Sequence, residues 1–257
     1  MKESNNNESD LSASKERSQG RWWEFYFVRY FVGTVFGTVL IIFLANHPSS
    51  GIKKLISQSI QFTSLKDING MNVWIFLLIG LAFCYLASAP VLVLHSFRGS
   101  LFFLSKARLC KYKERWIQKL ILSSPIIIIS IYTLRRISLN WQNNSEYYFY
   151  LFSSIIIAQI ALILIDIWYG TVNSYYTSLC SNRSVKTATN NEIVESYKHL
   201  REHGNAFMII LMEFILGVVL YNISNISVLI FVVITWIFPA TLVWFCGTSL
   251  EYNQEVK

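Results

Sequence analysis

The sequence predicts an all-α, polytopic membrane protein with about six transmembrane helices and both termini in the cytosol. The first reason is composition: 53% of the 257 residues are hydrophobic and only 14% are charged, whereas about a quarter of the residues in soluble domains are charged. The second reason is that the apolar residues gather in separate runs. The third is that lysine and arginine are distributed unevenly among the segments that join these runs.

Six apolar runs have the length of a membrane crossing, which takes about 20 residues of helix. Aromatic residues of the kind that favour the membrane interface lie at their ends, among them Trp22, Trp74, Trp116 and Trp168. The third and fifth runs are the shortest. The predicted spans are residues 25–45, 72–94, 117–134, 147–166, 206–221 and 226–246. Prolines inside them predict kinks at Pro90, Pro125 and Pro239.

Six crossings divide the connecting segments between two sides of the membrane. Of the 22 lysines and arginines, 17 fall on the side formed by residues 1–29, 96–119, 170–205 and the C-terminal tail. Basic residues mark the cytosolic side, so both termini are predicted to be cytosolic. The formal net charge of +7 is thereby explained as a topology signal, and no nucleic-acid partner is expected.

The chain divides into a disordered cytosolic tail (residues 1–21), a six-helix membrane domain (22–250) and a C-terminal tail (251–257). Within the membrane domain, the helical spacing of apolar residues near 52–63 predicts a helix lying in the outer interface, with an exposed loop helix as the alternative. The longest cytosolic connection is 170–205. There, Thr189 followed by Glu192 has the spacing of a capping box and predicts a helix start. Gly204 and Asn205 predict a kink or a separate helix before the fifth span.

Polar groups inside apolar spans are the first candidates for function, because each costs free energy in hydrocarbon unless it is satisfied. Glu213 lies in the fifth span, Gln159 in the fourth and Tyr85 in the second. We expect these three side chains to meet in the interior of the bundle. Glu213 is then either a proton- or ion-sensitive group or a protonated carboxyl that only joins helices.

Two glycines in the first span, Gly33 and Gly37, form a GxxxG motif. This spacing places small residues on one helical face, which allows the backbone of a neighbouring helix to approach closely. The motif predicts a helix interface either within the monomer or between copies of the chain.

Two cytosolic segments carry further candidates. A basic segment between the second and third spans predicts a surface for acidic lipid headgroups or a partner protein, with the topology signal as its simpler explanation; it contains Arg98, Lys106, Arg108, Lys111, Lys113 and Arg115. The other segment, His199-Leu200-Arg201-Glu202-His203, fits the H-x-x-E-H pattern of a zinc site. A solvated helix face with ion pairs explains the same residues, and we expect no metal or other cofactor.

Together these features predict a non-enzymatic protein of sensor, effector or immunity type in a bacterial inner membrane. Its basic cytosolic face docks a partner protein or acidic lipid, and its bundle responds through Glu213. One alternative is a small oligomeric ion or proton channel or transporter that uses Glu213. Another is a membrane-embedded, metal-dependent enzyme built on His199, Glu202 and His203. The expected partner is the lipid bilayer, while a homo-oligomer and a cytosolic protein partner are interactions that the sequence leaves open.

Overall fold

In the computed structural model, the described residues are 22–53, 70–104, 116–141, 146–176 and 188–255. Their side chains are described over 30–53, 74–97, 116–141, 146–176 and 205–248. These residues form α-helices and short connections, with no strand among them. The helices are α2 (Trp22–Asn46), α4 (Gly70–Ala87), α5 (Ala89–Leu104), α6 (Trp116–Asn140), α7 (Glu146–Tyr169), α9 (Ala188–Tyr221) and α10 (Ile226–Glu255).

Four helical segments in the described part of the chain are long and apolar enough to cross a membrane. They are Trp74–Phe97, which joins α4 to α5, together with Trp116–Asn140, Glu146–Tyr169 and Ile226–Thr248. These four correspond to the second, third, fourth and sixth apolar runs. The first and fifth runs lie in α2 and α9, where the apolar stretches are shorter, Tyr30–Asn46 and Asn205–Tyr221. The all-helical class is confirmed, and the four long apolar helices suggest an integral membrane protein.

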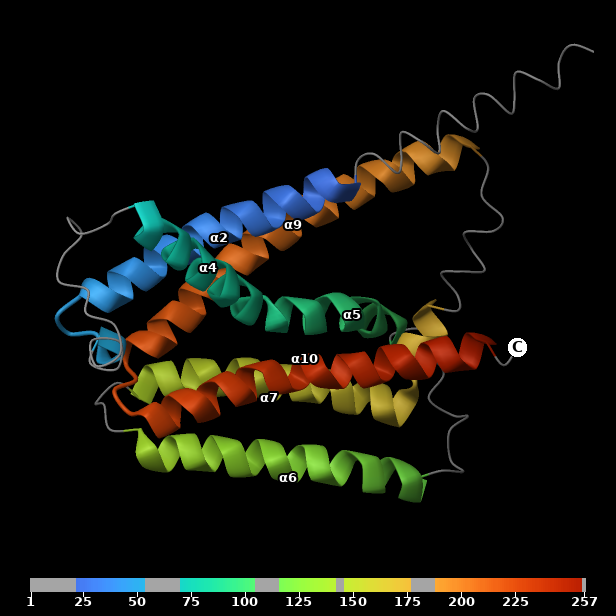
Figure 1. Cartoon of the computed structure of the whole chain (residues 1–257). Helices are drawn as coiled ribbons and strands as arrows, with labels where there is room; N and C mark the ends of the chain where they lie inside the picture. Colours follow the sequence, from blue (N-terminus) through green and yellow to red (C-terminus); the bar gives the residue numbers. More distant parts are fainter. Residues whose placement is uncertain (1–21, 54–69, 105–115, 142–145, 177–187, 256–257) are drawn as a thin grey trace, which may run out of the picture.

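The helices pack in two groups (Figure 1). One group contains α2, α4 and α9, and the other contains α5, α6, α7 and α10. The chain passes from the first group to the second where α4 ends and α5 begins. The second group has an apolar exterior on α6, where Ile121, Ile128 and Ile131 are each more than half exposed. Such a surface is what a helix presents to lipid.

The break between α4 and α5 lies at Ser88, two residues before Pro90. Proline has no N–H, so Pro90 leaves the carbonyl of Leu86 without its helical donor. The indole Nε1 of Trp236 on α10 donates a hydrogen bond to this oxygen at 3.0 Å. Trp236 is completely buried and stacks on Phe152 of α7, with ring centroids 5.9 Å apart. The break is therefore fixed against the second group of helices.

Other sequence predictions have mixed outcomes. Helix α9 begins at Ala188, which confirms the helix start near Thr189. Of the two alternatives expected at Gly204 and Asn205, the separate helix is wrong, because α9 continues through both residues to Tyr221, and the kink stays a prediction. Pro125 and Pro239 lie inside helices that continue on both sides of them, and the kinks expected there stay predictions. Of the predicted interfacial helix near 52–63, only residues 52 and 53 are described, and the predicted tail 1–21 lies outside the described residues.

Candidate functional site

Glu213 lies on α9, where this helix packs against α2 and α4, and its side chain is completely buried. It is eight residues before the end of α9 at Tyr221, or about 12 Å along the axis at about 1.5 Å per residue. The carboxyl therefore sits well inside the apolar part of the helix, in the first group of helices.

The glycines of α2 make room for this carboxyl. A Cβ atom placed on Gly33 would lie 3.4 Å from Oε1 of Glu213, and one placed on Gly37 would lie 3.2 Å from the same oxygen. The Cβ on Gly37 would also lie 2.9 Å from the carbonyl oxygen of Gly80 on α4. The GxxxG motif thus faces α4 and α9 of its own chain, and the carboxyl occupies the space that its missing side chains leave.

The carboxyl of Glu213 has no hydrogen-bond partner among the described residues, at either oxygen. The thiol of Cys84, which is completely buried on α4, lies beside it, and a thiol is only a weak hydrogen-bond donor. No basic side chain within the described ranges pairs with it. An ionised carboxylate in such surroundings costs several kcal/mol. The contact as it stands therefore favours a protonated, uncharged carboxyl.

The predicted meeting of Glu213 with Gln159 and Tyr85 is not found. Gln159 is buried on α7, at 1% exposure, but its Nε2 donates to the carbonyl of Ile155 in its own helix at 3.2 Å, and its Oε1 has no partner in the described part of the chain. Neither of its amide atoms bonds to Glu213. The reason is that Glu213 faces α2 and α4, whereas α7 belongs to the other group of helices.

Tyr85 points outward, since 67% of its surface is exposed, and the prediction that it lies in the interior is wrong. Its ring stacks on that of Tyr30 from α2, with centroids 5.8 Å apart and planes at 16°. The physical reason is helical phase. Cys84 faces the interior, and the next residue is turned by about 100° around the helix axis.

The sequence reasoning missed Gly80 and Cys84, which bring α4 close to α2 and Glu213. Their signal was present, because two small residues four positions apart in the second span repeat the spacing of Gly33 and Gly37. A Cβ atom on Gly33 would collide with the sulfur of Cys84, and one on Gly80 would collide with the hydroxyl of Thr38. Each small residue is thus matched to a neighbour on the facing helix.

The remaining sequence candidates lie outside the described side chains. The basic residues Arg98, Lys106, Arg108, Lys111, Lys113 and Arg115 are among them, and so are His199, Glu202 and His203. Among the residues that the structure does describe, no group of three or more histidine, cysteine or acidic side chains could hold a metal ion.

Glu213 is thus an ionisable side chain that lies completely buried among packed, mostly apolar helices. Comparison with protein-family models, curated proteins and solved structures finds no match for this chain.

Proposed function

We propose that this chain is a non-enzymatic membrane sensor or effector in which occupancy of Glu213 by a proton or a cation controls the packing of α2. The observation that carries the proposal is a completely buried carboxyl without a hydrogen-bond partner among the described residues, held between two glycines of α2 and Cys84 of α4. Membrane carboxyls of this kind typically mark ion or proton sites.

The coupling to α2 follows from the tightness of the contact. Even a single carbon added to Gly33 or Gly37 would come within 3.4 or 3.2 Å of Oε1. A cation beside the carboxyl, or water that enters with a charged carboxylate, needs more room than this contact leaves. Since packed interfaces switch between discrete arrangements rather than deform continuously, we expect α2 to move away from α4 and α9 when the charge state of Glu213 changes.

We further propose six membrane crossings with both termini in the cytosol. The distribution of basic residues supports this topology, and so does the packing at one end of the bundle. His47, just after α2, contacts Tyr221 at the end of α9, with 3.1 Å between Nδ1 and the hydroxyl oxygen. Trp141, after α6, lines a small space with residues 222–225. The described residues that border or form the segments predicted to lie outside thus gather at the same end (Figure 1). The basic residues between Arg98 and Arg115 are, in this proposal, the cytosolic surface that docks a partner protein or acidic lipid.

A pulsed electron paramagnetic resonance measurement tests the response. Spin labels at the exposed positions Val35 on α2 and Phe214 on α9 report the distance between these helices, in a background with serine at Cys110, Cys180 and Cys246. In lipid, we expect the wild-type distance to increase from acidic to alkaline pH, because deprotonation places an unpartnered charge in the contact. Glu213→Gln should hold the acidic-pH distance throughout, since glutamine has the same size and cannot titrate.

Gln159→Leu is the matched control, because it removes a buried polar group from the other set of helices and should leave the response intact. Glu213→Leu should fold at least as well as the wild type, because Glu213 satisfies no donor that its loss would strand. If the wild-type distance is the same at all pH values and in sodium, potassium and choline salts, the proposal that Glu213 controls the packing of α2 is wrong. Proton flux into proteoliposomes that Glu213→Gln abolishes would instead assign the chain as a transporter or channel.

A further inference from the structure

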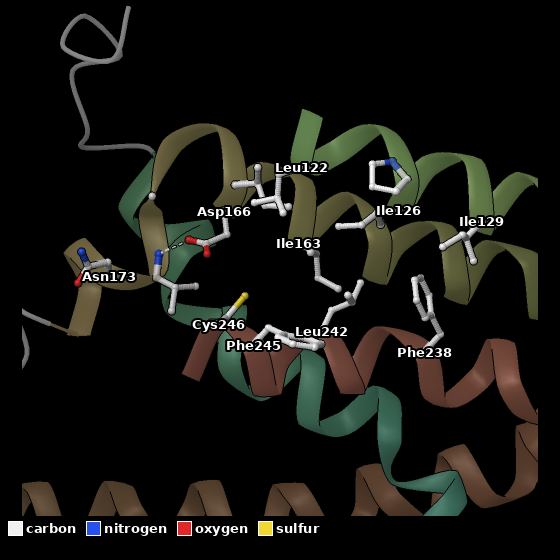
Figure 2. A pocket seen from close by; sticks show the side chains of 14 residues that line it. Leu122, Ile126, Ile129, Ile163, Asp166, Asn173, Phe238, Leu242, Phe245 and Cys246 are labelled. Atoms are coloured by element: carbon white, nitrogen blue, oxygen red, sulfur yellow. Dashed lines mark hydrogen bonds between the residues drawn. The ribbon is translucent and has the colours of Figure 1, made fainter. Parts of the chain in front are cut away.

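A cavity of about 570 Å³ lies between α6, α7 and α10 (Figure 2). These helices belong to the second group, whereas Glu213 lies in the first group. Its volume is within the range of about 300 to 1,000 Å³ typical of small-molecule sites. Apolar side chains of the three helices form most of its wall, including Ile126, Ile163 and Leu242. Along α10 the lining extends from Phe238 to Cys246, or about 12 Å. The cavity is therefore a mainly apolar space that extends along the membrane helices.

One end of the cavity is polar. Asp166, near the end of α7, is the charged residue among those that line it, and Asn173 is a further polar residue of the lining. Oδ1 of Asp166 accepts hydrogen bonds from the Val172 N–H at 2.7 Å and from the Thr171 hydroxyl at 3.3 Å. Both bonds end on Oδ1, so that Oδ2 receives none from the described residues. The carboxyl thus has one oxygen committed to the turn after α7 and one available to a ligand.

The polar end of the cavity lies toward the membrane interface, and its apolar end lies toward the middle of the helices. The Asp166 end lies next to Trp168 and Tyr169, which close α7 and are residues of the interfacial kind. The other end reaches Ile129 and Phe238 toward the middle of their helices. At the rim, Leu122 and Phe245 are both more than half exposed, so the cavity is bordered by side chains that face lipid. A molecule with an apolar chain in the membrane and a polar head at the interface fits this space.

We infer that the cavity binds one acyl chain of a phospholipid with a primary-amine headgroup, whose ammonium donates a hydrogen bond to Oδ2 of Asp166. A negative carboxylate favours a cation over an anionic headgroup, and an ammonium supplies N–H donors that a quaternary amine lacks. The inference is independent of Glu213 and of the proposed topology.

Native mass spectrometry of the full-length protein tests this. The protein is reconstituted in vesicles with equal fractions of phosphatidylethanolamine, phosphatidylglycerol and phosphatidylcholine, and the retained lipids are counted after gentle extraction. We expect the wild type to retain phosphatidylethanolamine about tenfold over the other two, a preference that corresponds to about 1.4 kcal/mol. Asp166→Asn keeps an oxygen for the Val172 N–H and should lose this preference.

Leu242→Trp fills the cavity without changing Asp166 and should abolish retention of the lipid. Ile234→Trp makes the same addition at an exposed position of α10 and should retain it, which provides the matched control. Equal retention of the three lipids by the wild type would overturn the inference, and so would a preference for phosphatidylcholine as strong as that for phosphatidylethanolamine. Retention that survives Leu242→Trp in a monodisperse, helical sample would overturn it as well, whether or not Asp166→Asn folds.

Discussion

The packing around the helical glycines predicts that replacement by alanine changes the stability of the protein differently at four positions. These are Gly37, Gly80, Gly217 and Gly247. At Gly80, the added Cβ would lie 2.8 Å from both the Thr34 carbonyl oxygen and the Thr38 nitrogen. These are backbone atoms, which no rotamer change can move. At Gly217, the nearest atom is the flexible end of Leu40 at 3.6 Å, and at Gly247 nothing lies within 4 Å.

The magnitudes follow from two opposing terms. Overpacking a tight contact costs about 1 to 3 kcal/mol, and alanine in a helix is more favourable than glycine by about 0.5 to 1 kcal/mol. Because the Cβ would contact backbone atoms that cannot move aside, the cost of overpacking should lie in the upper part of its range, and Gly80→Ala should lower the free energy of unfolding by up to about 2.5 kcal/mol. Gly217→Ala and Gly247→Ala should raise it by up to about 1 kcal/mol, because they gain helix propensity without a clash.

Thermal unfolding in one detergent, followed by size-exclusion chromatography or circular dichroism, measures the order. At about 2 to 4 °C per kcal/mol for a chain of this size, Gly80→Ala should melt several degrees below the wild type, with Gly37→Ala also below it. The two control variants should melt at or above the wild-type temperature. If Gly80→Ala is as stable as Gly217→Ala, the close approach of α2 and α4 described above is wrong.

Two further predictions concern the ends of the bundle. Cysteines introduced at Ser14 and Asn143 should react with an impermeant maleimide from opposite sides of the membrane, and reaction from one side alone would refute six crossings. Tyr221→Phe removes the hydroxyl that contacts His47 at 3.1 Å and should lower the free energy of unfolding by about 1 kcal/mol. In a His47→Ala background, the same change should have no measurable cost. An equal cost in both backgrounds would show that the contact contributes no stability.

The sequence predicts the helices well because hydropathy and basic residues act over whole segments. The apolar runs at 147–166 and 226–246 lie within α7 and α10, and the break near Pro90 follows from the chemistry of a single residue. The site is harder to predict, because it depends on which face of each helix meets which partner. Glu213 and Gln159 are both buried, yet they belong to different contacts. Tyr85 lies one residue from the buried Cys84 and faces the opposite environment.

At two of the prolines in the apolar helices, the carbonyl oxygen left without its helical donor accepts a hydrogen bond from a side chain, which is a neighbour in one case and distant in the sequence in the other. Each proline leaves the carbonyl four residues earlier without its helical donor, and in hydrocarbon that oxygen needs another partner. For Pro125, the hydroxyl of Ser124 donates to the carbonyl of Ile121 at 3.3 Å, and α6 continues unbroken. For Pro90, the donor to Leu86 is Trp236, which is 150 residues away, and the helix breaks. The donor for Pro125 is the neighbouring residue and can be predicted from the sequence. The donor for Pro90 lies on another helix and can be identified only once the fold is known.

This difference gives a double-mutant prediction for Trp236 and Pro90. Trp236→Phe preserves an aromatic ring against Phe152 but strands the buried Leu86 carbonyl, so it should cost about 1 to 3 kcal/mol. Pro90→Ala provides a backbone N–H that can donate to the same oxygen. In the Pro90→Ala background, Trp236→Phe should therefore cost at least about 1 kcal/mol less, measured by chemical or thermal unfolding in one detergent. Independent sites usually add within about 0.5 kcal/mol, so additivity within that margin would show that Trp236 does not replace the donor lost at Pro90. Phe152→Leu serves as the control, because it removes the stacked ring and leaves the hydrogen bond, and its cost should be the same in both backgrounds.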